Sequence, residues 1–296
     1  MIVYAIVNQK GGTGKTTTAI NLAAALGEAG ERVVVVDLDP QANATLHAGL
    51  QIEEGEPTIW SAIQADLHAE EPPDPWPADG SAPRAPSHKG LTLADCVRRA
   101  AKDPFDIVPA SLDLAQADAD LLQAFNRERR LARLVEPLRD AYGHVLIDCP
   151  PYLGLLTINA LGAADQVLVP VQAEFLAMAG LRTLLRTVAR VRRDLNYRLE
   201  VGGILITHLD RRTVHSQTIA NQVRQTLSPY YHVFETTIPI NVDLANASAA
   251  RCSVLAHAPT SSGARAYREL AVEMLARPVP RPPDAEKETK GDQAQS

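Results

Sequence analysis

The chain has 296 residues, of which 46% are hydrophobic and 22% are charged, and its formal net charge is −6 at pH 7. This composition is typical of a globular protein with a sizeable core, and the length allows one large domain or two ordinary ones. The negative charge disfavours a protein that coats nucleic acid through its overall charge, and leaves only a local basic patch for that purpose.

Cysteine usage and apolar runs narrow the class of protein further. The three cysteines, Cys96, Cys149 and Cys252, lie far apart without a CxxC pair, which disfavours a disulfide framework, a zinc site or a thioredoxin-type site. The N-terminal stretch has no basic leader and no cleavage site. No apolar run approaches the roughly 20 residues that span a bilayer. We therefore expect a cytoplasmic protein without a membrane segment.

Buried strands and helices alternate along the chain. Residues 2–7 form a short apolar run of the kind found in buried parallel strands, and four valines at 33–36 predict a second strand after a helical pattern that ends near Gly30. Similar runs predict strands at residues 144–147, 166–171, 203–207 and 232–236. Helical patterns cover residues 181–194, 216–227 and 264–275. The alternation predicts an α/β fold, in which a doubly wound, mostly parallel sheet carries helices on both faces.

Two stretches lack this periodicity. Residues 68–90 contain six prolines and predict an extended surface insertion. Residues 277–296 are polar and rich in proline, which predicts a disordered tail. We therefore expect a single domain over residues 1–276 that contains the insertion.

The sequence NQKGGTGKTT at residues 8–17 joins the first strand to the first helix. Glycine has no Cβ, so backbone N–H groups in such a turn can approach a phosphate, and the helix N-terminus adds partial positive charge there. Lys15 is placed for the β and γ phosphates of a nucleotide, and the Thr16 hydroxyl for Mg²⁺. The usual first glycine is replaced by Gln9, and an additional lysine, Lys10, follows it.

Three aspartates follow predicted strands. Asp37 and Asp39 lie two residues apart in VVVVDLDPQ, so both side chains point the same way if the backbone stays extended. Asp148 ends the run HVLID, as expected for a Walker B aspartate that acts on magnesium through water. Each of them alone would suit a solvated strand end. Together with the phosphate loop they favour a magnesium–nucleotide site.

The motif KGGTGKTT resembles the deviant phosphate loop of the ParA/MinD family of ATPases. Four further segments are similar to the ParA partition branch of that family, namely DCPPYLGLLTINAL, VLVPVQAEFLAMAGL, THLDRRT and HAPTSSGARAYREL. The resemblance covers residues 1 to about 276. Because the loop begins within ten residues of the N-terminus, the chain is most similar to the short, Soj-like form, which lacks a helix-turn-helix domain.

The resemblance implies a P-loop fold, ATP and Mg²⁺ as cofactors, and weak ATP hydrolysis that a partner stimulates. It also implies a homodimer that forms with ATP, in which Lys10 reaches the nucleotide of the partner subunit. Asp37 would belong to the magnesium shell, and Asp39 would position the attacking water. The implied catalytic residues are Lys10, Lys15 and Asp39, and the implied metal ligands are Thr16, Asp37 and Asp148. The implied nucleotide contacts are Lys10, Gly11, Gly12, Thr13, Gly14, Lys15, Thr16, Thr17 and Pro239.

ParA proteins bind DNA non-specifically, and a ParB-like centromere-binding protein acts on them, so the resemblance implies a nucleoid-associated protein with a basic surface. On the predicted helix at 181–194, four arginines fall on one stripe: Arg182, Arg186, Arg190 and Arg193. Nearby basic residues are Arg192, Arg198, Arg211 and Arg212, and Arg212 occupies the DxRT position that contacts DNA in the family. The stripe also fits an ordinary solvated helix face.

Two alternatives stay open. Relatives often carry arginines in the segment that here reads IPINVDL, with Ile240 and Asp243 in those places, which keeps a positioning ATPase for a non-DNA cargo under consideration. A MinD-like membrane ATPase is disfavoured, because the last twenty residues have no clear apolar face. The isolated cysteines likewise do not suit a bridged iron–sulfur cluster and fit buried structural positions better.

Overall fold

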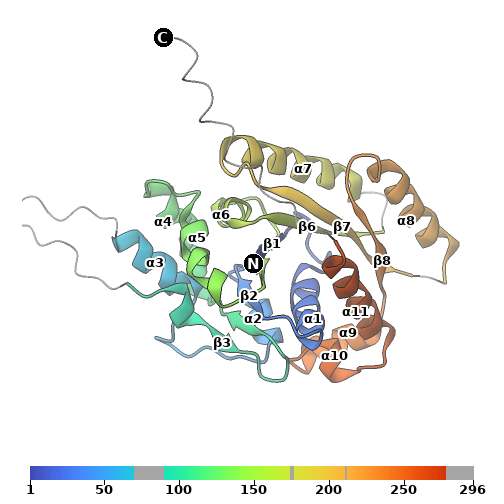
Figure 1. Ribbon diagram of the computed structural model, residues 1–296, viewed down its shortest axis with the longest axis horizontal. Coiled ribbons are helices and arrows are strands. Elements are labelled where there is room, and N and C mark those ends of the chain that lie inside the picture. Colours follow the sequence, from blue (N-terminus) through green and yellow to red (C-terminus); the bar gives the residue numbers. More distant parts are fainter. Residues whose placement is uncertain (70–89, 174–176, 211, 278–296) are drawn as a thin grey trace, which may run out of the picture.

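The computed structural model describes residues 1–69, 90–173, 177–210 and 212–277 (Figure 1). The predicted insertion and tail therefore lie almost entirely outside the described residues. Helix α3 (Ile59–Ala69) includes the first two residues of the predicted insertion. No helix in the described part of the chain is long and apolar enough to cross a membrane.

The described strands form one eight-stranded sheet in the order β3-β4-β2-β5-β1-β6-β7-β8. All neighbouring pairs are parallel except β3 and β4, which are antiparallel at one edge. The strands are β1 (Ile2–Ile6), β2 (Val33–Asp37), β3 (Arg98–Arg99), β4 (Asp106–Val108), β5 (His144–Asp148), β6 (Gln166–Gln172), β7 (Glu200–Leu209) and β8 (Val233–Pro239). The predicted doubly wound, mostly parallel sheet is confirmed.

Helices cover both faces of the sheet (Figure 1). One face packs against α1 (Lys15–Glu28), α2 (Asn43–His47), α9 (Val242–Ala249), α10 (Val254–His257) and α11 (Ser262–Leu275). The other packs against α3, α4 (Ala117–Gln123), α5 (Arg130–Val135), α6 (Leu155–Ala163), α7 (Ala177–Asp194) and α8 (Val214–Leu227). Short 3₁₀ helices lie at Leu93–Cys96, Leu112–Gln116 and Glu136–Asp140.

The valines of β2 show how the sequence builds two cores. Val34 and Val36 pack into the core on the side of α3 to α8, whereas Val33 and Val35 pack into the core beneath α1 and α11. All four are at most 2% exposed. Fully burying a valine stabilises the fold by roughly 1.5–3 kcal/mol, so a strand that is apolar at every position is stable between two helical layers. The three cysteines are also buried and have free thiols, as predicted.

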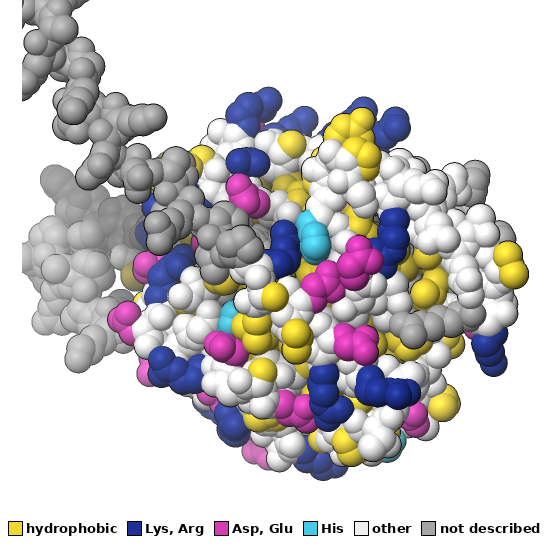
Figure 2. All heavy atoms as spheres, turned by 45° about the vertical axis from the view of Figure 1, so that its right-hand side comes forward, with side chains coloured by type: hydrophobic (Ala, Val, Ile, Leu, Met, Phe, Trp, Pro, Cys, Tyr) yellow, Lys and Arg dark blue, Asp and Glu magenta, His cyan; other side chains and the backbone are white. Residues whose placement is uncertain are grey.

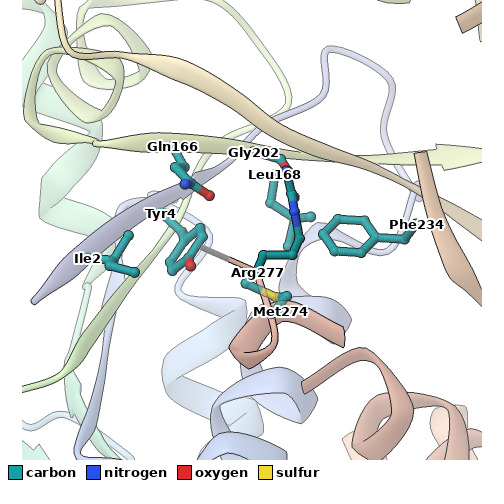
Figure 3. A pocket seen from close by; sticks show the side chains of 8 residues that line it. All are labelled: Ile2, Tyr4, Gln166, Leu168, Gly202, Phe234, Met274 and Arg277. Carbon is teal, nitrogen blue, oxygen red and sulfur yellow. The ribbon is translucent and has the colours of Figure 1, made fainter. Parts of the chain in front are cut away.

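Arg277, which was predicted to begin the disordered tail, is instead anchored to the body of the protein. Its guanidinium donates a hydrogen bond to the Gly202 carbonyl and lies 5.8 Å from the centre of the Phe234 ring. Figure 3 shows its side chain reaching toward Gly202 beside Phe234, among the residues that line a small cavity. The cavity has room for about 10 Å³, enough for one water molecule, so it is not a ligand site.

Candidate nucleotide and magnesium site

The glycine-rich loop lies at the carboxyl end of β1, near the middle of the sheet, and leads directly into α1. Gly12 and Gly14 have φ angles of 73° and 87°, and Gly14 is the N-cap of the helix. These left-handed conformations cost a residue with a Cβ roughly 1–2 kcal/mol, which explains the glycines at these two positions. The structure thus places a phosphate-binding turn at a helix N-terminus.

Side chains from neighbouring strands hold the loop in shape. Gln172 at the end of β6 donates its amide Nε2 to the Gly12 carbonyl at 2.7 Å, and the Thr207 hydroxyl on β7 donates to the Thr13 carbonyl at 2.9 Å. Tying carbonyl groups to donors outside the loop fixes the peptide planes that carry its N–H groups. Sequence reasoning missed both residues. Both are polar residues near the carboxyl end of a strand, and both strands, β6 and β7, lie on the same side of β1 in the sheet. This pattern is the sequence signal that could have identified them.

Lys15 supplies the inner cation of the site. Its side chain is buried, at 7% exposure for the residue, and its Nζ lies 3.5 Å from the Lys10 carbonyl oxygen. Burial lowers the pKa of Lys15, and the neighbouring carboxylates of Asp148 and Asp39 oppose that shift. A buried lysine between a phosphate loop and two carboxylates is placed to bind an anion.

Asp37 and Asp148 lie directly opposite each other on the adjacent strands β2 and β5, and both are fully buried. Thr45 donates two hydrogen bonds to Asp37 Oδ2, from its N–H at 2.8 Å and from its hydroxyl at 2.7 Å. Burial raises the pKa of Asp37 to about 6, although the bonds from Thr45 act to lower it. Thr45, which sequence reasoning did not single out, fixes the orientation of this carboxylate.

Asp148 is the least compensated carboxylate of the site. Neither of its oxygens has a well-formed hydrogen bond to any described residue, although the Thr16 hydroxyl lies close enough to stabilise the charged form. Burial, and next the charge of Asp37, raise the pKa of Asp148 well above its ordinary value. A buried carboxylate without partners is costly, and a cation or the water molecules around it would satisfy both oxygens.

The residues at this site suit Mg²⁺, which is bound partly by water and phosphate, better than a metal whose ligands all come from protein side chains. Within the described ranges, no group of three or more histidine, cysteine, aspartate or glutamate side chains forms a ready metal site. Mg²⁺ usually keeps several waters and takes one or two carboxylates together with phosphate oxygens. Thr16, Asp37 and Asp148 could hold the ion in this way, directly or through water.

Asp39 follows β2 and is fixed by its own turn. Its N–H donates to Asp37 Oδ1 at 3.3 Å, and its Oδ1 accepts from the Gln41 N–H at 3.0 Å. The residue is 8% exposed. The two aspartates of the DLD motif are therefore brought together, with Asp39 turned toward the same end of the sheet as Asp148 and Lys15.

Lys10 lies on the exposed side of the loop. Its Nζ donates to Gln172 Oε1 at 2.9 Å, and its N–H donates to the side chain of Asn8 at 3.0 Å. The two lysines of the motif are five residues apart, but Lys10 is exposed to solvent and Lys15 is buried.

A pocket of about 500 Å³ lies beside Gly14 and Thr17 of the loop, and Pro239 lines it together with His208. His208 has a φ of 53°, which is unusual for a residue other than glycine, and the pairing of β7 with β8 is irregular there. Strained backbone of this kind often occurs at binding sites. Pro239 thus lines the same pocket as Gly14 and Thr17 of the loop, and its contact with a nucleotide base stays a prediction.

The arginine stripe on α7 is exposed as predicted, and Figure 2 shows Lys and Arg side chains gathering along the upper edge of the molecule, where α7 lies. Two of the predicted DNA contacts are paired with acidic side chains. Arg193 binds Asp194 through two hydrogen bonds, and Arg212 binds Asp210 in the same way. Arg211 lies outside the described residues. The charge that the surface offers to a ligand therefore comes mainly from the stripe residues Arg182, Arg186 and Arg190.

Replacing Asp148 by asparagine tests the cost of its buried charge. A carboxyl whose pKa is raised in the folded protein favours folding when protonated, so the nucleotide-free protein loses stability as pH rises above about 4 toward the raised pKa. We expect Asp148→Asn to raise Tm at pH 7 by about 3–8 °C without nucleotide, and by much less near pH 4. Calorimetry across this pH range, with Mg²⁺ and ATP in parallel, measures it. A lower Tm for the asparagine variant at pH 7 would contradict the assignment.

Taken together, the doubly wound sheet, the loop with two lysines and the magnesium-type carboxylates define a P-loop ATPase of the deviant Walker A class. A family model described as an AAA domain matches residues 1–201. The chain belongs to the ParA/Soj family of partition ATPases.

The relatives support this family over nearly the whole chain. The sporulation initiation inhibitor protein Soj of Bacillus subtilis is 38% identical and covers 93% of this chain and 98% of its own. The chromosome-partitioning ATPase Soj of Thermus thermophilus is 43% identical, with 92% and 95% covered. A solved structure, cobyrinic acid a,c-diamide synthase from Mycobacterium smegmatis with bound ADP and magnesium, is 33% identical, with a TM-score of 0.74 and coverages of 93% and 94%.

Proposed function

We propose that this ATPase is a dimerising switch that partitions a chromosome or plasmid on non-specific DNA together with a ParB-like partner. The observation that carries the proposal is the different placement of the two lysines of the loop. Lys15 is buried beside the carboxylates of its own subunit, whereas Lys10 is exposed on the outer side of the loop. A second cation at that position serves a phosphate that arrives with another subunit.

ATP and Mg²⁺ are the cofactors, and different residues of the site bind the phosphates, hold the ion and orient the water. The N–H groups of the loop and the Lys15 ammonium bind the phosphates, while Thr16, Asp37 and Asp148 would hold the ion. When bound, Mg²⁺ compensates charge on the phosphate oxygens. Asp39 orients the attacking water, and phosphoryl transfer needs little more than such positioning and charge compensation. Slow hydrolysis then sets the lifetime of the ATP-bound dimer. The ParB-like partner stimulates hydrolysis and so shortens this lifetime.

The α7 stripe is the surface that we assign to DNA. Its arginines are spaced along one exposed helix face, as needed to follow a phosphate backbone, inside a protein whose overall charge is negative. By family resemblance, Arg212 occupies the DxRT position that contacts DNA. Because Asp210 already binds its guanidinium through two hydrogen bonds, we assign it a smaller share than the stripe.

Co-sedimentation with sequence-unrelated DNA tests this function. The wild-type protein should bind with ATP and Mg²⁺ and not with ADP, and reversing the stripe charges (Arg182→Glu, Arg186→Glu, Arg190→Glu together) should weaken binding at least about tenfold. A plot of log affinity against log salt concentration should also become less steep, its negative slope decreasing in magnitude by about 3, or about one for each lost phosphate contact. Arg212→Glu should have a smaller effect. Arg265→Glu, on the opposite helical layer, is the matched control and should change nothing beyond its contribution to net charge.

The same experiment distinguishes DNA partition from the positioning of a cargo other than DNA. Ile240 and Asp243 stand where relatives often carry arginines, and Ile240 is 59% exposed. If ATP produces a dimer that does not sediment with DNA at low salt, the proposal fails in its DNA part. A positioning ATPase for a cargo other than DNA would then be favoured.

A further inference from the structure

Gln172, the last residue of β6, contacts two parts of the phosphate loop with one side chain. Its Oε1 accepts a hydrogen bond from Lys10 Nζ at 2.9 Å, and its Nε2 donates to the Gly12 carbonyl at 2.7 Å. A side-chain amide carries both an acceptor and a donor, so a single glutamine can make both contacts. Neither glutamate nor a hydrophobic residue of similar length can make the pair.

The backbone of Lys10 is held separately from its side chain. Asn8 accepts the Lys10 N–H at 3.0 Å and donates its own amide to the Pro170 carbonyl at 2.7 Å, which ties this part of the loop to β6. Asn8 is 7% exposed, and its two hydrogen bonds fix the orientation of its amide. The Lys10 side chain can consequently leave Gln172 by rotating its own bonds, without movement of the loop.

We propose that Gln172 is a positioning residue that holds Lys10 on its own subunit and thereby sets how tightly the ATP-bound subunits dimerise. The inference rests on the proposed role of Lys10 at the partner subunit's nucleotide. In the isolated subunit the ammonium is bound to Gln172, so that bond breaks before Lys10 reaches across. Charge-assisted hydrogen bonds in exposed positions shift such an equilibrium by about 3- to 10-fold.

Two substitutions should move the dimer in opposite directions. Gln172→Met removes this acceptor for the Lys10 ammonium and should tighten the ATP dimer about 3- to 10-fold. Gln172→Glu replaces the neutral acceptor by a carboxylate, holds Lys10 more firmly as an ion pair, and should weaken the dimer by a similar factor. Both variants lose the donor to Gly12, so a residue that only shaped the loop would change dimerisation in the same direction in both.

The measurement is sedimentation equilibrium at saturating ATP and Mg²⁺, in an Asp39→Ala background that prevents turnover. ADP affinity, measured separately, should fall a few-fold in both variants, because both lose the bond to the Gly12 carbonyl. Gln225 is exposed on α8 and provides the control pair, Gln225→Met and Gln225→Glu, which should leave both quantities unchanged.

The outcomes separate this inference from the proposed function. If the Asp39→Ala background itself does not dimerise with ATP, the proposed function fails and this inference fails with it. If the background dimerises but Gln172→Met and Gln172→Glu shift the dimer in the same direction, or not at all, only the role of Gln172 is overturned. Opposite shifts at Gln172, with unchanged behaviour of the Gln225 variants, support it.

Discussion

Replacing Asp39 by alanine is expected to lower ATP turnover at least about 100-fold while leaving ATP affinity within about threefold. The Asp39 backbone and one carboxylate oxygen are fixed by Asp37 and Gln41, which holds the side chain ready to orient a water molecule. It is not a partner of the loop N–H groups that would bind phosphate. Steady-state hydrolysis and equilibrium nucleotide binding, measured on the same preparation, separate the two quantities.

Asp140 offers a matched control for this change, because it is an exposed aspartate at the end of a 3₁₀ helix that precedes the amino end of β5, whereas the loop lies at the carboxyl end of the parallel strand β1. Asp140→Ala should hydrolyse ATP at the wild-type rate. Normal turnover by the Asp39→Ala protein would remove Asp39 from the reaction and shift attention to the other carboxylates of the site.

Replacing Lys15 by alanine is expected to weaken ATP binding at least about 100-fold, since charge-assisted bonds to phosphate oxygens contribute about 1.5–3 kcal/mol each. The loss should exceed that of any other single change in the loop, because Lys15 is the buried cation that faces Asp148 and Asp39. Its removal also leaves those carboxylates less compensated. Titration calorimetry with ATP and Mg²⁺ measures the affinity.

Lys102→Ala is the control for Lys15→Ala. Lys102 is exposed and donates to the Ala250 carbonyl at 3.3 Å, away from the loop. The control should bind ATP normally. A Lys15→Ala protein that is folded by circular dichroism and still binds ATP with wild-type affinity would contradict the assignment of the phosphate site.

The sequence predicted most of the frame of the site, because that frame depends on local patterns. Four valines between turns indicate a strand buried on both faces, and β2 extends only one residue beyond the predicted 33–36. The carboxyl ends of parallel strands meet at one edge of the sheet, so Asp37 and Asp148 could be expected to lie together, as they do in register. The short strands β3 and β4 carry no such run and were missed.

Contacts between distant segments could not be predicted from these patterns. Gln172 and Lys10 are 162 positions apart, and only the placement of β6 beside β1 brings them within hydrogen-bond distance. The role of Thr45 depends in the same way on how α2 turns back over Asp37. The pairing of Arg212 with Asp210 depends on rotamers, which explains why a conspicuous arginine offers less charge than its sequence position suggests.

The central claim is that ATP joins two copies of this chain through Lys10, and sedimentation velocity of two matched proteins tests it most directly. With ATP and Mg²⁺, the Asp39→Ala protein should sediment as a dimer, and with ADP as a monomer. The Lys10→Ala/Asp39→Ala protein should remain a monomer with either nucleotide while binding ATP with unchanged affinity. Dimerisation of this double variant to the same extent as the single variant would contradict the claim.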